Sequence, residues 1–280
     1  MLGLRNIALG IGLAFALAGT APAANQYWDT AAGAGIQGGN GTWSTTDANW
    51  SDTRVGTALS VWTAGNDAWF VAPSNGAPSA ATVASSFNVR SVTIDGSPYT
   101  LIVTNGGQML AGSAASIVGS SSSNNTVILT GSGSLWSAPG QGLTVGYAAA
   151  ATNNRLLLSD GAVVSNGTFI VGDLAASHNA VTISGATLYS GAATIGKPTA
   201  GSNPGTNNTV TVSANGAWNL LSSSLTIGVR SVSNSLTVNG GLVTNVSALT
   251  LGQFVGAGNA SGGNKLIIAN GGVVVVSGSI

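Results

Sequence analysis

The feature that most restricts the fold of this chain is a short pattern that recurs through its C-terminal half. One copy, residues 143–165, contains an alternating triplet that ends in glycine, a polar insert, an asparagine that opens a second alternating run, and a turn glycine before a third run. Alternation of apolar and polar residues is typical of β-strands. Each unit therefore predicts three short strands, separated by one loop and two corners.

Six copies of the pattern share this order. The triplets end at Gly119, Gly146, Gly172, Gly196, Gly228 and Gly252. The turn glycines are Gly133, Gly161, Gly185, Gly216, Gly241 and Gly272. Successive triplet glycines lie 24 to 32 residues apart, by subtraction of their positions, and nearly all of the variation falls between the glycine and the asparagine. The pattern thus predicts a constant three-stranded frame with one variable loop per repeat.

A parallel β-helix meets these requirements, because each coil lays three strands on the three sides of a prism and the next coil pairs with it at about 4.8 Å. We predict an all-β fold, a right-handed single-stranded parallel β-helix (a solenoid) of about six to seven coils. Alternate apolar residues such as Leu156 and Leu158 should face inward and stack on their counterparts. A propeller of the WD type fits poorly, because its repeats need roughly 40 residues or more.

The recurring asparagine has a structural explanation. Where a coil turns a corner, its backbone leaves N–H and C=O groups without strand partners, and a buried amide side chain can satisfy both and also bond the amide of the next coil. The variable loop beside it is where a binding function could be located. We therefore predict a structural asparagine ladder formed by Asn125, Asn154, Asn179, Asn208, Asn234 and Asn264.

The chain divides into three parts. Residues 1–23 have an early positive charge, a short apolar stretch and the small-residue motif Ala21-Pro22-Ala23, so they predict a signal peptide cut after Ala23. The apolar stretch is too short to span a bilayer, which needs about 20 residues, and no later stretch is long and apolar enough to do so. The repeat array occupies residues 91–280. It stops inside a repeat, so we expect it to be truncated and to self-associate end to end through its uncapped apolar end.

Residues 24–90 have a different composition, rich in glycine and tryptophan. One hypothesis is a platform of aromatic rings that stacks on sugars. The other is a cap that covers the open end of the solenoid, and we favour the cap because stacked repeats need atypical terminal units. The region contains Trp28, Trp43, Trp50, Trp62 and Trp69, and the candidates for stacking on sugars are Trp28, Trp43, Trp50 and Trp62.

The charge pattern excludes several kinds of partner. The formal net charge is zero, and only 5% of the residues are charged. Nucleic acids and anionic membrane surfaces need a clustered basic patch, which this sequence lacks, so we expect neither as a partner. The chain has no cysteine, which rules out disulfides and thiolate metal sites. We predict no metal site and no cofactor.

Few residues of the array could support catalysis. A glycosidase needs two carboxylates that face each other, and a lyase of this fold usually needs acidic calcium ligands beside a basic residue. The array offers Asp160 in a turn sequence, Asp173 at the start of a loop, Arg155, and the single histidine, His178, in the same loop. Neighbouring repeats supply no partner for either aspartate, so we predict no catalytic residue.

The tryptophan-rich opening, WDT…GNGTWSTTDANW…VWTAGNDAWF, is followed by an array of the form NxVxV…G…LTVG. In both respects the chain resembles the autotransporter-associated β-strand repeat proteins, which are passenger-type β-helices of bacteria. The resemblance covers most of the mature chain. It implies export, a β-helix, and a structural or adhesin-like role at the cell surface.

We therefore expect a non-enzymatic, exported protein that is secreted or lies on the cell surface. Its partners would be surface glycans or proteins of host or neighbouring cells. The alternative is a carbohydrate-binding or polysaccharide-degrading β-helix protein that uses the tryptophan-rich region or one face of the helix.

Overall fold

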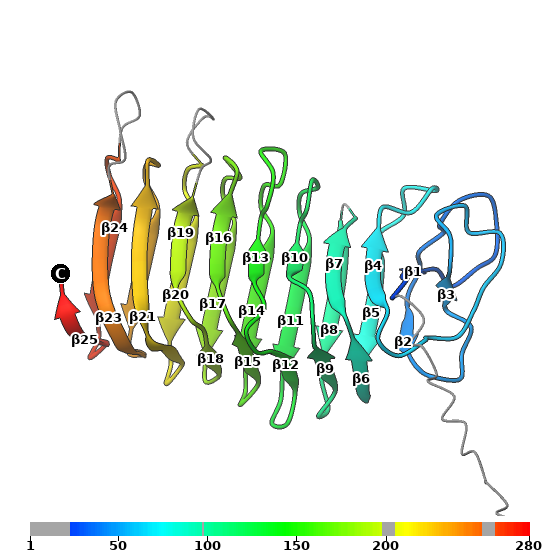
Figure 1. The fold of residues 1–280 in the computed structure, drawn as a ribbon, viewed down its shortest axis with the longest axis horizontal. Helices are drawn as coiled ribbons and strands as arrows, with labels where there is room; N and C mark the ends of the chain where they lie inside the picture. The colour runs from blue at the N-terminus through cyan, green and yellow to red at the C-terminus, as the bar shows by residue number, and fades with distance from the viewer. Residues whose placement is uncertain (1–22, 97, 198–204, 254–260) are drawn as a thin grey trace, which may run out of the picture.

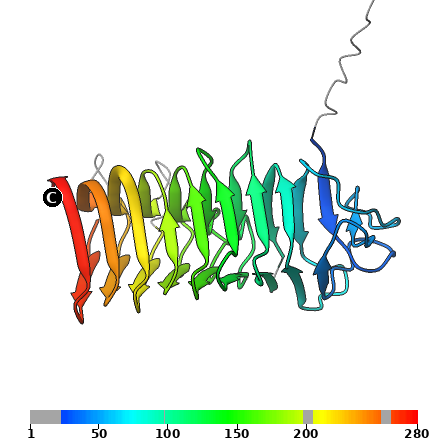
Figure 2. The ribbon, with the colours of Figure 1, turned by 90° about the horizontal axis from the view of Figure 1, so that it is seen from below.

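The computed structural model describes residues 23–96, 98–197, 205–253 and 261–280. The predicted signal peptide, apart from Ala23, lies outside the described residues. The described residues form strands, turns and loops without any helix, and therefore include no helix that could cross a membrane. They build a parallel β-solenoid of about eight turns (Figures 1 and 2). The predicted fold class is confirmed.

Each turn lays one strand on each of three faces, which we number in the order in which the chain visits them. Face 1 contains β1 (Asn25–Trp28), β4 (Asp67–Val71), β7 (Ser91–Asp95), β10 (Ser116–Val118), β13 (Leu143–Val145), β16 (Phe169–Asp173) and β19 (Ala193–Lys197). Face 2 contains β2 (Gly41–Trp43), β5 (Ser79–Val83), β8 (Tyr99–Val103), β11 (Thr126–Thr130), β14 (Arg155–Ser159), β17 (Ala180–Ser184), β20 (Thr209–Ser213), β22 (Ser235–Asn239) and β24 (Lys265–Ala269). Face 3 contains β6 (Ser86–Val89), β9 (Gln108–Ala111), β12 (Leu135–Ala138), β15 (Val163–Asn166) and β18 (Thr187–Tyr189).

The last turns join faces 3 and 1 into longer strands. β21 (Ala217–Val229) pairs with β18 through its first residues and with β19 through its later ones, and β23 (Leu242–Gln253) and β25 (Val273–Ser279) follow it. A single antiparallel strand, β3 (Trp50–Ser51), flanks β1. All other strand pairings in the described part of the chain are parallel, apart from two isolated antiparallel bridges.

The core is continuous along the solenoid, because inward positions of successive turns are in register. On face 2, for example, Leu129, Leu158 and Ile183 are paired in neighbouring strands and are all buried. One buried cluster extends from Trp28 to Leu249. Each turn therefore adds a similar apolar layer to the same core, as nearest-neighbour stacking in a repeat protein requires.

The predicted number of six to seven coils is too low because parallel pairing begins before residue 91. β4, β5 and β6 already form a complete turn that pairs with β7, β8 and β9. β1 and β2 pair in parallel with β4 and β5 ahead of that turn. The sequence of these first turns lacks the asparagine and the triplet glycine, so the repeat pattern alone did not reveal them.

The triplet glycines stand at the corner between faces 1 and 2, which we call the loop corner. Gly146 and Gly172 have φ angles of 77°, in the left-handed region that favours glycine. A Cβ atom on either would overlap the ladder amide of the following turn, that of Asn179 or Asn208 respectively. The glycine is needed both for the turn and for the close approach of the amide.

Candidate functional site

The tryptophan-rich region forms an interlocked aromatic cluster. Trp28, Trp43 and Trp50 have no exposed surface, and Trp62 is 6% exposed. Ring centroids lie 4.6 Å apart for Trp43–Trp50 and 4.7 Å apart for Trp50–Trp62. Rings without an exposed face cannot stack on a sugar, so the interpretation of these four side chains as a glycan platform is wrong. They fill the core of the first turns.

A buried carboxyl group lies in the same region. Asp29 is fully buried, and its Oδ1 accepts hydrogen bonds from the backbone N–H groups of Gln37 (3.0 Å) and Ala31 (3.5 Å). Its Oδ2 has no partner among the described residues. Burial raises the pKa of Asp29, while the two backbone hydrogen bonds act in the opposite direction. Burial and the charge of Asp29 together raise the pKa of the Tyr99 hydroxyl well above its usual value.

The six predicted ladder asparagines lie in one continuous row at the start of face 2. From Asn125 to Asn234, each side-chain amide donates to the side-chain oxygen of the asparagine in the next turn, at 2.9 to 3.1 Å, and the row ends at Asn264. The same oxygen also accepts the backbone N–H of the preceding asparagine, at 3.0 to 3.1 Å. Several of the amides also donate to loop carbonyls, such as Asn179 to Ala151 at 3.0 Å. The row therefore satisfies backbone groups that the corner would leave unpaired.

The ladder begins where the aromatic cluster ends. The residue aligned with Asn125 in the preceding turn is Tyr99, which is fully buried and has its ring 5.3 Å from that of Phe70. The Oδ1 of Asn125 is consequently buried without a hydrogen-bond partner among the described residues. The change from amide to aromatic marks a boundary between two ways of filling the same position.

The loop corner carries a second, outer row of polar residues. The residue before each ladder asparagine has a left-handed backbone and is exposed: Asn124, Asn153, His178, Asn207, Ser233 and Gly263. Two shallow hollows lie along this row. One, of about 360 Å³, is lined by Asn124, Thr126, Asn153 and Arg155. The other, of about 460 Å³, is lined by Asn207, Ser233, Ser235, Gly263, Lys265 and Ile267.

The residues considered for catalysis are not brought together as a pair of carboxylates. Asp160 directly follows the face 2 strand β14, and its Oδ2 accepts hydrogen bonds from Thr130 and Ser159, both at 2.8 Å. These bonds lower the pKa of Asp160. Asp173 lies at the loop corner beside Lys197 on the paired strand, and burial raises its pKa despite a hydrogen bond from the Leu174 N–H. The two carboxyl groups therefore sit at different corners of the turn.

His178 also lies at the loop corner. Its side chain is exposed, and its Nε2 lies 3.2 Å from the Asn207 side-chain nitrogen of the next turn. Among the described residues, no group of three or more His, Cys, Asp or Glu side chains could bind a metal ion. The local contacts of His178 are those of an outer-row corner residue.

A smaller set of aromatic residues lies on the outside of the first turns and was not singled out from the sequence. Tyr27 on β1 is aligned with Trp69 on β4, and both side chains are partly exposed. Their ring centroids are 6.3 Å apart with the planes at 45°, and the Arg54 guanidinium carbon lies 5.9 Å from the Tyr27 centroid. Alternation could have identified them, since their neighbours Trp28 and Phe70 face inward.

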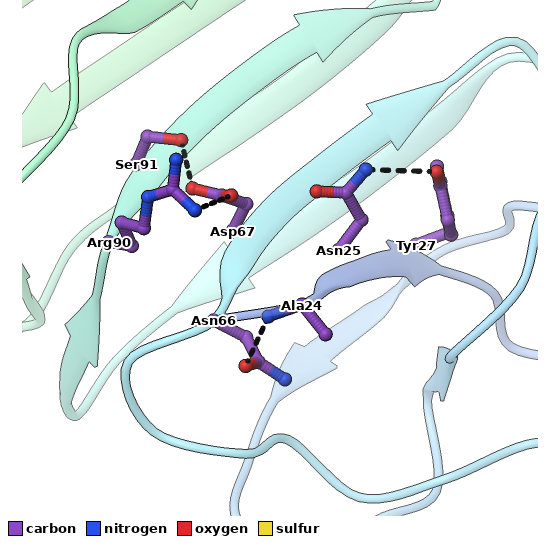
Figure 3. Close-up of polar contacts among 7 residues, drawn as sticks. All are labelled: Ala24, Asn25, Tyr27, Asn66, Asp67, Arg90 and Ser91. Carbon is purple, nitrogen blue, oxygen red and sulfur yellow. Dashed lines mark hydrogen bonds and ion pairs between the residues drawn. The ribbon is translucent and has the colours of Figure 1, made fainter. Parts of the chain in front are cut away.

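Polar side chains lie near Tyr27 and on the strands beside it (Figure 3). The Asn25 amide donates to the Tyr27 hydroxyl at 3.3 Å. Asp67, which is aligned with Asn25 on the next strand, accepts a hydrogen bond from the Ser91 hydroxyl at 2.5 Å and pairs with Arg90 at 3.3 Å. We call Asn25, Tyr27, Arg54, Asp67, Trp69 and Arg90 the outer patch.

Comparison of the chain with protein-family models, curated proteins and solved structures found no match to any of them. The functional proposals below therefore depend on the sequence and the geometry of this chain alone.

Proposed function

We propose that this protein is an exported, non-enzymatic structural or adhesin-like β-solenoid of the autotransporter-associated repeat type, secreted or held at the cell surface. The observation that carries the proposal is the combination of a constant frame with variable loops at one corner. The ladder fixes the register of six successive turns through buried hydrogen bonds. Loops of different length leave that frame at a single corner, so they can change without disturbing the strands.

The loop corner supplies the recognition surface in this proposal. Its outer row presents amide and hydroxyl groups at the repeat spacing of the strands, about 4.8 Å. Arg155 and Lys265 are exposed beside the two hollows. Such a row favours contact with an extended partner, either a surface glycan or a protein of a host or neighbouring cell.

Self-association at the C-terminal coil belongs to the same proposal. Ile268 continues the inward column of Ile183 and Val212 but is 52% exposed, whereas those two are fully buried. A second copy that packs on this coil would cover it. We expect sedimentation analysis of residues 24–280 to show concentration-dependent dimers that Ile268→Asp abolishes. A wild-type protein that stays monomeric at all concentrations would remove this part of the proposal.

The adhesin-like role is tested with purified residues 24–280 coupled to beads. We expect the beads to attach to bacterial or animal cells, and attachment to fall when residues 147–153 are replaced by the shorter natural insert DLAASH, which leaves Asn154 in place. A matched control carries Thr182→Ala on the outside of face 2. Attachment that is the same for coated and uncoated beads, or release of reducing sugar from any polysaccharide by the purified protein, would contradict the proposal.

Export is tested separately. We expect the full chain produced in a Gram-negative host to leave the cytoplasm and to begin at Ala24, as measured by mass spectrometry of the mature protein. A cytoplasmic product that still carries residues 1–23 would contradict export.

A further inference from the structure

The outside of face 1 changes character between its first two turns and the rest of the array. The column that begins with Tyr27 and Trp69 continues, strand by strand, with threonine and isoleucine only. Its later members are Thr93, Ile117, Thr144, Ile170, Thr194, Thr226 and Thr250. Small β-branched residues are sufficient for the outside of a strand. The two aromatic residues therefore exceed what the frame needs at this position.

The two rings are also unnecessary for closing the core. Trp28 and Phe70, their neighbours in the chain, point inward, are fully buried and complete the aromatic cluster with ring centroids 6.2 Å apart. Tyr27 and Trp69 lie on the opposite side of the same two strands, where they keep part of their surface exposed. They form a surface pair that faces solvent.

The groups around the rings can form hydrogen bonds with a ligand. Asn25 is exposed, and its amide donates to the Tyr27 hydroxyl through a long bond of 3.3 Å. The Arg90 side chain is 42% exposed while it pairs with Asp67, which is 10% exposed. Arg54 lies over the Tyr27 ring and is also exposed. The Tyr27 ring is thus bordered by one amide and one guanidinium group, and a second guanidinium group, that of Arg90, lies beyond Asp67.

We propose that the outer patch is a saccharide-binding site. A sugar ring has apolar C–H faces and hydroxyl groups around its rim, so one ring can rest on Tyr27 and Trp69 while its hydroxyls bond to Asn25 and Arg90. Arg54, whose guanidinium group lies close to the Tyr27 ring, adds a cation to the patch, which favours a saccharide that carries carboxylate groups. This site is distinct from the loop corner and does not depend on the adhesin-like role.

The test is affinity electrophoresis of residues 24–280 in gels that contain hydroxyethylcellulose, glycol chitin or polygalacturonate. We expect the wild-type protein to be retarded most strongly by polygalacturonate. Trp69→Ala and Tyr27→Ala should each weaken binding by about tenfold or more, whereas Trp69→Phe should retain most of it. Arg54→Gln should weaken binding to polygalacturonate more than binding to the neutral polymers.

The matched control is Thr226→Ala, which removes a side chain from the same column far along the array and should leave retardation unchanged. Circular dichroism and thermal unfolding establish that each variant is folded, and Arg54→Gln keeps the test informative if Trp69→Ala does not fold. Absence of retardation in all three gels would overturn the proposal. So would folded Trp69→Ala and Tyr27→Ala proteins that are retarded as strongly as the wild type, a result that would leave the rings as a contact surface for protein instead.

Discussion

From Asn125 to Asn234, the position at the start of face 2 in each turn is a buried amide that bonds the next turn, whereas in the two turns before Asn125 the aligned position holds Tyr99 and Ser79. The array keeps its register through directional hydrogen bonds. The front turns are filled by aromatic rings packed on one another, such as Trp43 on Phe87 with centroids 4.7 Å apart. The same backbone geometry is thus stabilised by two different kinds of interaction.

The two regions also differ in how the buried polar groups that recur in them are paired, although Trp136 Nε1 and Asn166 Oδ1 in the array also lack a partner among the described residues. From Asn154 onward, the Oδ1 atom of each ladder asparagine accepts two hydrogen bonds. In the front region, the indole N–H groups of Trp43, Trp50 and Trp62 are buried without partners among the described residues. An unpaired buried N–H costs stability, whereas a packed ring contributes by the area that it buries. The array should therefore be sensitive to loss of a hydrogen bond, and the front region to loss of volume.

The largest effect is expected for Asn179→Ala in the middle of the ladder. Its oxygen accepts from the backbone and side chain of Asn154, and its amide donates to Ala151 and Asn208. The substitution leaves several buried groups unpaired, for an expected loss of about 3 to 6 kcal/mol in the free energy of unfolding. Urea unfolding measures it, and hydrogen exchange should show the loss centred on the turns around β14 and β17.

The comparison is sharpened by Asn179→Leu, which keeps a similar volume but cannot form these bonds. We expect it to be about as damaging as the alanine variant. An Asn179→Leu protein as stable as the wild type would show that packing, and not the ladder hydrogen bonds, determines the stability of the array.

Trp50 provides the corresponding test in the front region. Its ring contacts Trp28, Trp43 and Trp62, so Trp50→Ala should cost about 3 to 5 kcal/mol through the cavity that it creates. Trp50→Phe removes no hydrogen bond and should cost much less, in contrast to Asn179→Leu. Hydrogen exchange should localise the loss to residues before Asn125, because each turn contacts only its neighbours. Loss of protection throughout the array would contradict this division.

The triplet glycine gives a smaller effect that separates two reasons for its presence. Gly172→Ala combines a left-handed backbone with overlap against Asn208, whereas Gly140 has a φ of 76° and open space within 4 Å of the point where a Cβ atom would lie. We expect Gly140→Ala to cost about 1 kcal/mol and Gly172→Ala about 2 to 4 kcal/mol. Thermal unfolding measures the loss of stability in the two variants. Equal losses would show that Asn208 shifts to accommodate the added methyl group at residue 172 without a further cost.

The sequence was sufficient to predict the array because each turn repeats both its inward residues and its corner residues. Asn154 and Leu156 recur at a constant offset from each other, and Gly146 recurs at the end of every triplet, so their roles followed from register. The front turns have the same backbone geometry, but other residues, Phe87 and Tyr99 among them, fill the equivalent positions. The repeat pattern therefore could not identify these turns. The outer patch was missed for a related reason: the tryptophans were treated as one group, although alternation along β4 puts Trp69 outside and Phe70 inside.

The smallest expected effect concerns the pH dependence of the front region. Burial raises the pKa of Asp29 above its ordinary value of about 3.9, so the folded state binds this proton more tightly than the unfolded state does. The contribution of Asp29 to the free energy of unfolding is therefore most favourable at low pH and declines as the pH rises from the unfolded pKa through the folded one. Oδ2 of Asp29 has no hydrogen-bond partner among the described residues, which adds a reason to prefer the neutral form. We expect Asp29→Asn to gain stability relative to the wild type as the pH rises above the pKa of Asp29 in the unfolded state, as measured by urea unfolding over a range of pH. A difference that is constant with pH would mean that Asp29 titrates alike in both states and that its burial is compensated.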